Sequence, residues 1–145
     1  MMIVGSIVMS ALFLPTVDQA ELECLAHNIY HEARGERIEG QIAVAHVTVN
    51  RVNHPNWGGS ICEVVYELKQ FSWTFLLDDH TPTDTRAYNK AKVIARDVML
   101  GNTEDPSLGA VFYHANYVDP AWAEQLQISR VIGSHIFYTW DGKWK

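Results

Sequence analysis

The hydrophobic residues in the first hundred positions recur every three or four residues, which is the spacing of amphipathic helices. Apolar residues between Leu22 and Ala33 predict a first helix. Asp18 and Glu21 have the spacing of a capping box at its start, and Gly35 offers a stop. The folded part of the chain is therefore predicted to begin with one well-delimited helix.

Three more helices are predicted before residue 101. Apolar residues over 38–52 keep the helical period, although their many valines leave a strand open. Ser60 and Glu63 have the spacing of a second capping box, ahead of a short helix. Residues 71–83 have no clear period and are predicted to be irregular, whereas 87–98 predict a longer helix.

The last third of the chain changes character. The segments 110–114 and 135–139 are short runs rich in β-branched and aromatic residues, which predict strands. Between them, Asp119-Pro120 is typical of a helix start, with proline at the first helical position. Together these segments predict an α+β fold, a mainly helical domain with a small antiparallel sheet.

An uncharged segment precedes the first helix. Residues 1–14 carry no charged side chain, and Pro15 ends the run. This length is too short for a comfortable membrane span but fits the apolar part of a signal peptide. The run lacks a preceding Lys or Arg, so an uncleaved anchor and a buried helix stay open. We expect an apolar leader over 1–20, export to the periplasm or the exterior, and one domain over 21–145.

Charge narrows the classes of function. Eleven Lys and Arg against seventeen Asp and Glu give a net charge of −6 with histidine neutral. Nucleic-acid binders need a basic footprint, so a nucleic-acid partner is not expected. Binding to an anionic polymer would have to come from a shaped groove, and membrane contact from the leader alone. We expect a monomer.

Cys24 and Cys62 are the two cysteines of the chain. In an exported protein they would most simply form one disulfide, which contributes about 3–4 kcal/mol on the chain-entropy model. In a cytoplasm, two reduced and buried thiols would be equally plausible. There is no Cys-x-x-Cys motif, so the sequence gives no support to redox catalysis or to a thiolate zinc site.

Glu32 is the carboxylate whose position is most informative. It lies on the flank of the apolar stripe of the first helix, near the end of that helix. Partial burial there would disfavour the ionised form and raise its pKa, as a general acid requires. Taken alone, however, a glutamate near a helix end is more often a solvated surface residue.

The residues around Glu32 carry a resemblance. Six segments, in this order, resemble those of the SleB-type cell wall hydrolases: Tyr30–Glu36, Glu39–Gln41, Asn50–Val52, Cys62–Tyr66, Gln70–Trp73 and Ile132–Tyr138. The resemblance covers about residues 21–140. It implies a peptidoglycan-cleaving enzyme with a lysozyme-like, largely helical core. The family's catalytic glutamate precedes Ala-Arg-Gly-Glu, a position that Glu32 occupies here.

Several further side chains are candidates for substrate binding. Glu36 would assist Glu32 or bind sugar, or would only pair with Arg34 or Arg51. Aromatic rings would stack on sugar rings and polar groups would bind N-acetyl groups, although each such residue is more often structural. The candidates are Glu36, Gln70, Phe71, Ser72, Trp73, Tyr113, His114, His135 and Tyr138, with Trp57 as a further ring. Asp78 and Asp79 would supply a second carboxylate, or are plain loop.

The seven histidines raise the question of a metal. His27 and His31 have the i, i+4 spacing of two zinc ligands on one helix. They point away from the apolar stripe and form no His-Glu-x-x-His motif, so a solvated face is the default interpretation. We therefore expect no metal and no cofactor.

These observations lead to one main hypothesis and three alternatives. The main hypothesis is cleavage of the β-1,4 bond between N-acetylmuramic acid and N-acetylglucosamine by a lytic transglycosylase that uses one glutamate. Simple hydrolysis of the same bond is the nearest alternative. An N-acetylmuramoyl-L-alanine amidase is another, and a peptidoglycan-binding module without catalysis belongs to a different class.

Overall fold

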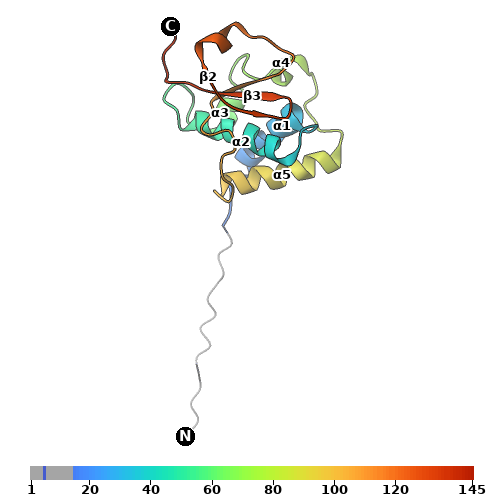
Figure 1. Cartoon of the computed structure of the whole chain (residues 1–145). Coiled ribbons are helices and arrows are strands. Elements are labelled where there is room, and N and C mark those ends of the chain that lie inside the picture. Colours follow the sequence, from blue (N-terminus) through green and yellow to red (C-terminus); the bar gives the residue numbers. More distant parts are fainter. Residues whose placement is uncertain (1–4, 6–14) are drawn as a thin grey trace.

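The structure is a computed structural model that describes Gly5 and residues 15–145. Within these residues the chain forms five α-helices, one 3-10 helix and three strands (Figure 1). Their bounds are α1 Gln19–Ala33, α2 Ile38–Val52, α3 Ile61–Val65, α4 Trp73–Leu76, α5 Thr85–Met99, β1 Phe112–Ala115, η1 Ala121–Gln125, β2 Gln127–Ile132 and β3 His135–Thr139. The predicted mainly helical α+β fold is confirmed.

Helix α1 begins earlier than the predicted domain boundary. Asp18 caps it, because Oδ1 accepts a hydrogen bond from the Glu21 N–H at 3.1 Å. The preceding segment is held as well, since Arg96 donates to the Pro15 carbonyl at 2.8 Å. Cleavage after Ala20 would therefore remove the cap of α1. Most of the predicted leader, residues 1–4 and 6–14, lies outside the described residues. Among the residues that are described, no helix is long and apolar enough to cross a membrane.

Most of the helical predictions are confirmed. Helix α2 has the predicted bounds, so the strand alternative for 38–52 is wrong: eight of its residues are buried, Gly40 among them. The prediction of irregular chain over 71–83 is wrong in part, because α4 forms there as a single turn. The helix expected after Asp119-Pro120 is the 3-10 helix η1, with Pro120 at the cap rather than inside the helix.

The sheet contains one strand that the sequence analysis missed. The order is β1-β3-β2 and both pairings are antiparallel, so the missed strand β2 forms a hairpin with β3. In these pairings Ala115 of β1 and Ile132 of β2 both lie opposite His135. Gly133 forms the hairpin turn with φ +55°, a conformation that favours glycine.

Two clusters of buried side chains form the core. The first joins the helices to one another and includes Leu25 and Ile29 of α1. The second joins α2 to the sheet and includes Val44 and Phe137. Tyr113 packs against both clusters. Figure 1 shows this arrangement, with the strands on one side of α1 and α2 and with α5 on the other.

Helices α1 and α3 are joined in two ways. Cys24 and Cys62 form a disulfide, as predicted for an exported protein. The Glu21 carboxylate does not reach back to its own helix start; it accepts hydrogen bonds from the backbone N–H groups of Ile61 (2.6 Å) and Cys62 (3.2 Å). Glu21 therefore satisfies the free N–H groups at the start of α3, which a side chain from another helix can do as well as a local one.

Candidate active site

Glu32 lies in the last turn of α1, where the end of that helix faces the sheet. A pocket of about 220 Å³ opens at this point. Its walls come from the end of α1 and the following turn, from the end of β1, and from the β2–β3 turn: Glu32, Ala33, Gly35, Glu36, Ala115, Tyr117, Ser134 and His135. Three of the predicted site residues, Glu32, Glu36 and His135, thus line one pocket.

The surroundings of Glu32 change its acidity. Burial raises the pKa of the Glu32 carboxyl above its usual range. The Tyr113 hydroxyl and the positive charge of Arg51 act in the opposite direction without cancelling this effect. Glu32 is therefore a carboxyl that holds its proton to higher pH than an exposed glutamate, with a hydroxyl and a cation nearby to stabilise it once it is ionised.

Tyr113 of β1 supplies the hydroxyl next to Glu32. This oxygen is buried and has no partner in hydrogen-bond geometry among the described residues. Burial, together with the negative charge of Glu32, raises the pKa of Tyr113 well above its usual value. The phenol therefore stays protonated and can donate to the Glu32 carboxylate.

Arg51 of α2 is the buried cation of the site and is only 4% exposed. Its Nε donates to the Val111 carbonyl at 2.7 Å, and its Nη1 donates to the Gln70 side chain at 3.3 Å. The guanidinium also lies over three rings, those of Trp57, Phe71 and Phe112, at 5.1–5.3 Å from their centres. Burial lowers the pKa of Arg51 to about 10, so it keeps its charge at neutral pH.

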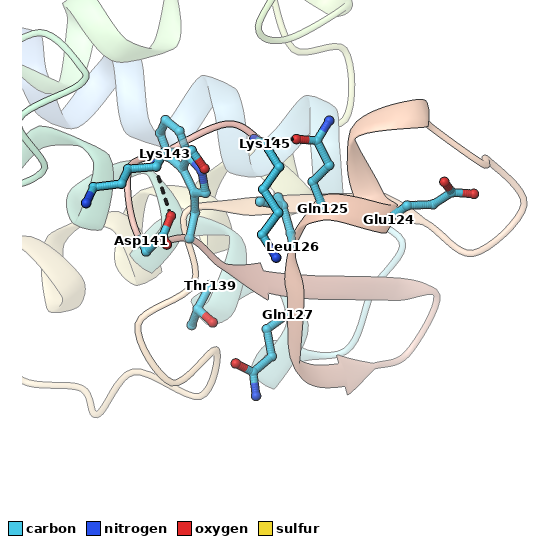
Figure 2. Close-up of a pocket in the computed structure, with 9 residues that line it drawn as sticks. Glu124, Gln125, Leu126, Gln127, Thr139, Asp141, Lys143 and Lys145 are labelled. Atoms are coloured by element: carbon cyan, nitrogen blue, oxygen red, sulfur yellow. Dashed lines mark hydrogen bonds between the residues drawn. The ribbon is translucent and has the colours of Figure 1, made fainter.

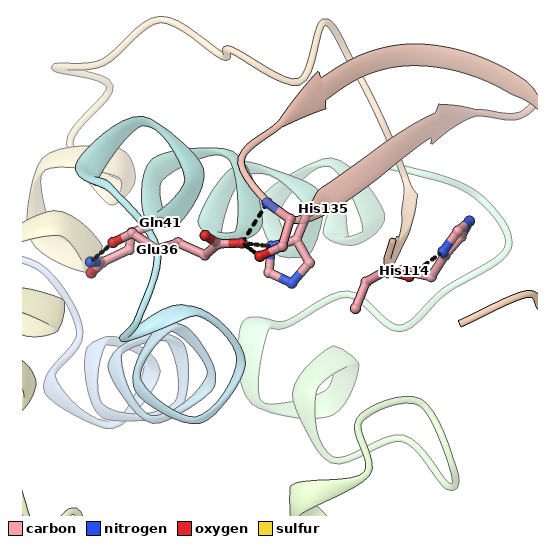
Figure 3. Close-up of polar contacts among 6 residues, drawn as sticks. Glu36, Gln41, His114 and His135 are labelled. Carbon is pink, nitrogen blue, oxygen red and sulfur yellow. Dashed lines mark hydrogen bonds and ion pairs between the residues drawn. The ribbon is translucent and has the colours of Figure 1, made fainter. Parts of the chain in front are cut away.

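Glu36 holds the β2–β3 turn against the end of α1 (Figure 3). Its Oε1 accepts hydrogen bonds from the Ser134 N–H, at 3.0 Å, and from the Ser134 hydroxyl. The same oxygen lies 3.4 Å from His135 Nδ1. Burial by itself would raise the pKa of Glu36, but the hydrogen bonds from Ser134 outweigh it, so the pKa is lowered. The alternative that Glu36 would only pair with Arg34 or Arg51 is wrong, because its ionic partner among the described residues is His135.

The histidines of the sheet are tied to their neighbours. Burial lowers the pKa of His135 despite the opposing charge of Glu36, which favours a neutral ring. His114 Nδ1 donates to the Ala115 carbonyl at 2.8 Å, because a carbonyl can only accept (Figure 3). In the neutral ring, Nε2 then accepts from the Tyr138 hydroxyl at 2.7 Å.

Comparison with known families identifies the group to which this site belongs. The sequence matches the Cell Wall Hydrolase family over residues 35–138, well over half of the chain. The chain belongs to the cell wall hydrolase family. The match begins three residues after Glu32, so it includes the pocket lining from Gly35 onward but neither Glu32 nor Ala33.

Two curated relatives carry the same description. The chain is 35% identical over 121 residues to a spore cortex-lytic enzyme of Bacillus subtilis, covering 81% of this chain and 37% of that protein. It is 34% identical over 121 residues to the spore cortex-lytic enzyme of Halalkalibacterium halodurans, covering 81% and 34%. The chain thus spans little more than a third of the length of these curated relatives.

Two solved structures have the same fold. One is the catalytic domain of the germination-specific lytic transglycosylase SleB from Bacillus anthracis, with a TM-score of 0.71 and 28% identity, covering 87% of this chain and all of that one. The other is the catalytic domain of the Bacillus cereus SleB protein, with a TM-score of 0.69 and 27% identity, covering 87% and 94%.

Two predicted sugar contacts of this cell wall hydrolase are wrong. Phe71 and Trp73 are 2% and 5% exposed and belong to the helical core. Arg51 covers the Phe71 ring, and His31 stacks on Trp73 with ring centres 4.5 Å apart. Neither ring presents a free face to a sugar.

Four other predicted contacts, Gln70, Ser72, His114 and Tyr138, do not line the pocket. Tyr138 is 5% exposed and can act only through His114. Gln70 holds Arg51, and Ser72 is exposed at the start of α4. Tyr117 and Ser134 line the pocket but were not among the predicted site residues, although Ser134 lies inside one of the segments that carry the resemblance.

The histidines proposed as a zinc pair make local contacts instead. His27 Nδ1 bonds to the Glu23 carbonyl at 2.7 Å, and His31 Nε2 bonds to the His80 carbonyl at 2.8 Å. In the part of the chain that the structure describes, no three His, Cys, Asp or Glu side chains are placed to hold a metal ion. Asp78 and Asp79 are exposed and do not line the Glu32 pocket.

Proposed function

We propose that this domain cleaves the β-1,4 bond between N-acetylmuramic acid and N-acetylglucosamine in peptidoglycan, with Glu32 as the general acid. The observation that carries the proposal is a carboxyl with a raised pKa in a pocket of a cell wall hydrolase, beside Tyr113 and Arg51. The similarity to a domain described as a lytic transglycosylase supports the same reaction.

The first step follows from the acidity of Glu32. The protonated carboxyl gives its proton to the glycosidic oxygen while positive charge develops on the muramic ring. The glutamate becomes an anion as the bond breaks. The Tyr113 hydroxyl and the charge of Arg51 both favour that anion, as their lowering effect on the Glu32 pKa indicates. They are positioning residues that make the proton easier to release.

The second step needs a nucleophile. The other carboxylate of the pocket lining is Glu36, whose Oε1 is engaged by Ser134. A dedicated carboxylate nucleophile, as in retaining glycosidases, therefore has a poor candidate here. We propose that the muramic 6-hydroxyl attacks its own ring carbon and that Glu32, now ionised, accepts the hydroxyl proton. The product is a 1,6-anhydro sugar, and no water enters the reaction.

Replacing Glu32 by Gln tests the assignment. Glu32→Gln keeps the volume of the side chain but cannot donate the proton, so digestion of purified peptidoglycan should fall by about 100-fold or more. The matched control is Glu39→Gln, because Glu39 is an exposed glutamate of α2 that pairs with Arg37 and Arg130. Both proteins are checked for folding by circular dichroism. A Glu32→Gln protein that digests peptidoglycan at the wild-type rate would overturn the role of Glu32.

Mass spectrometry of the products distinguishes the alternatives. Transglycosylation leaves 1,6-anhydromuramic ends, whereas hydrolysis leaves reducing muramic ends that are 18 mass units heavier, the mass of one water. An amidase would release free stem peptides from intact glycan. A binding module would release nothing and would hold peptidoglycan equally well with Glu32 or Gln. We expect disaccharide-peptides with anhydro ends.

We propose that the domain works outside the cytoplasm. Peptidoglycan lies there, and the disulfide between Cys24 and Cys62 suits an oxidising compartment. Thiol labelling of unfolded protein recovered from the periplasm or the medium, without a reducing agent, should find no free thiol. Two reactive thiols in that sample would contradict the proposed compartment.

A further inference from the structure

A second pocket lies away from Glu32. It has a volume of about 590 Å³ and is built by the start of β2, the end of β3 and the segment that follows β3 (Figure 2). Thr139 lies opposite Gln127 in the β2–β3 pairing, and both side chains line this pocket. His135, at the other end of β3, lines the Glu32 pocket. The two pockets are thus separated by the length of β3, about 13 Å for four residue steps.

The segment after β3 is held in place by its own hydrogen bonds. Trp140 Nε1 donates to the Lys143 carbonyl at 3.0 Å, and the Lys143 N–H donates to Asp141 at 3.0 Å. The Lys145 N–H donates to the Gln125 side chain at 2.9 Å, which closes the segment against η1. The pocket, which we call the tail pocket, is therefore a formed part of the fold. Residues 139–145 lie beyond the part of the chain that matches the family.

The lining of the tail pocket combines an aromatic surface with polar groups. Trp140 lines it, and Trp144 lies beside Trp140 with ring centres 4.8 Å apart while staying 52% exposed. The polar lining consists of amide, hydroxyl and charged groups: Gln125, Gln127, Thr139, Asp141 and Lys143. His54 stacks on Trp140, so the exposed ring of Trp144 is the indole surface open to a ligand at the edge of this pocket. An exposed indole with hydrogen-bonding groups beside it matches a sugar ring, which has an apolar C–H face and polar groups at its edge.

The charges of the lining favour a neutral ligand. Glu124 and Asp141 are balanced by Lys143 and Lys145, although the whole chain has a net charge of −6. A pocket without net charge gives no electrostatic preference for the acidic stem peptides of peptidoglycan. N-acetylglucosamine is uncharged, and its amide can pair with the side chains of Gln125 and Gln127.

We propose that the tail pocket is a second glycan-binding site that takes N-acetylated sugars of peptidoglycan and holds the enzyme on the polymer while Glu32 works elsewhere. This proposal takes peptidoglycan as the ligand and therefore rests on the proposed function. Because intact peptidoglycan offers many sugars at once, a second contact raises the effective concentration of substrate at the first. A short soluble fragment gains nothing from it.

The test compares insoluble and soluble substrate. Gln127→Ala removes one side chain of the tail-pocket lining, and Trp144→Ala removes the exposed ring that packs against Trp140 at its edge. Val93→Ala removes a comparably exposed apolar side chain of α5 (62% exposed). In an inactive Glu32→Gln background, co-sedimentation with purified sacculi should weaken by roughly tenfold for the first two variants and stay unchanged for the third. Trp144→Phe, which keeps a ring, should recover part of the binding.

With Glu32 restored, both variants should digest sacculi more slowly and should turn over a soluble tetrasaccharide fragment at the wild-type rate. Equal loss on both substrates would assign the effect to the Glu32 pocket and overturn the second site. If Trp144→Ala and Gln127→Ala bind sacculi as well as Val93→Ala does, the second site is overturned too. If the wild-type enzyme cleaves no glycan, the proposed function fails, while the co-sedimentation result still reports on the tail pocket.

Discussion

Glu36→Gln is the substitution for which the structure sets the clearest magnitude. The Glu36 carboxylate accepts two hydrogen bonds from Ser134, one from its N–H and one from its hydroxyl. A hydrogen bond to a charged group contributes about 1.5–3 kcal/mol and a neutral one about 0.5–1.5 kcal/mol. Gln keeps the acceptor oxygen and loses the charge, so the free energy of unfolding should fall by about 2–3 kcal/mol. The melting temperature should fall by roughly 6–12 °C.

The pH dependence provides a second check on Glu36. The pKa of Glu36 is held below its usual range in the folded chain, because the Ser134 hydrogen bonds outweigh the effect of burial. Its stabilising contribution is therefore complete above the unfolded pKa, about 4.3, and is lost as the pH falls through the folded value. Urea unfolding at pH 7 should show the full difference between wild type and Glu36→Gln, and below about pH 4 the two should converge.

Glu39→Gln is the control, because Glu39 forms only exposed ion pairs, which contribute less than about 1 kcal/mol. Activity should also decline in Glu36→Gln, since the turn that it releases carries part of the Glu32 pocket. If Glu36→Gln unfolds at the wild-type urea concentration at pH 7, or if its deficit is the same at pH 3, the carboxylate does not hold the turn.

Three further predictions follow from other contacts. Tyr113→Phe removes a hydroxyl that lowers the pKa of Glu32, so the pKa of Glu32 should rise. The alkaline limb of the pH profile of kcat/KM should then move to higher pH, and an unmoved limb would contradict this. Gly133→Ala should lower the free energy of unfolding by about 1–2 kcal/mol or more, measured in urea, because its φ is +55° and a Cβ would lie 2.9 Å from a carboxylate oxygen. Reduction of the Cys24–Cys62 bond should cost about 3–4 kcal/mol in the same assay, and equal stability with and without reductant would refute it.

Local patterns predicted the helices well and the sheet only in part. Helix α2 was found with its bounds because its apolar residues recur at helical spacing over fifteen residues, although Ile38, Ile42, Val49 and Val52 are not fully buried. Strand β2 was missed because most of its side chains are exposed or half-buried and a bulge between Ile128 and Arg130 interrupts the two-residue alternation. Helix α4 was missed because four residues are too few to show a period.

The candidate site required contacts that no local pattern contains. The position of Glu32 was inferred from its helix face and from the family resemblance. The hydroxyl of Tyr113 and the charge of Arg51 reach it from β1 and α2, segments far apart in the sequence. The wrong sugar contacts at Phe71 and Trp73 have the same origin, because an aromatic residue looks alike in sequence whether it is buried or exposed.

The Glu21 carboxylate has a consequence for how the disulfide forms. The Glu21 carboxylate accepts hydrogen bonds from the N–H groups at the start of α3, and Glu21 lies one turn of α1 before Cys24. Helix α3 can therefore dock on α1 through this carboxylate while both thiols are still reduced, which keeps Cys62 next to its partner. Oxidation of the docked helices then joins two thiols that are already neighbours, which limits bonding to a second copy of the chain.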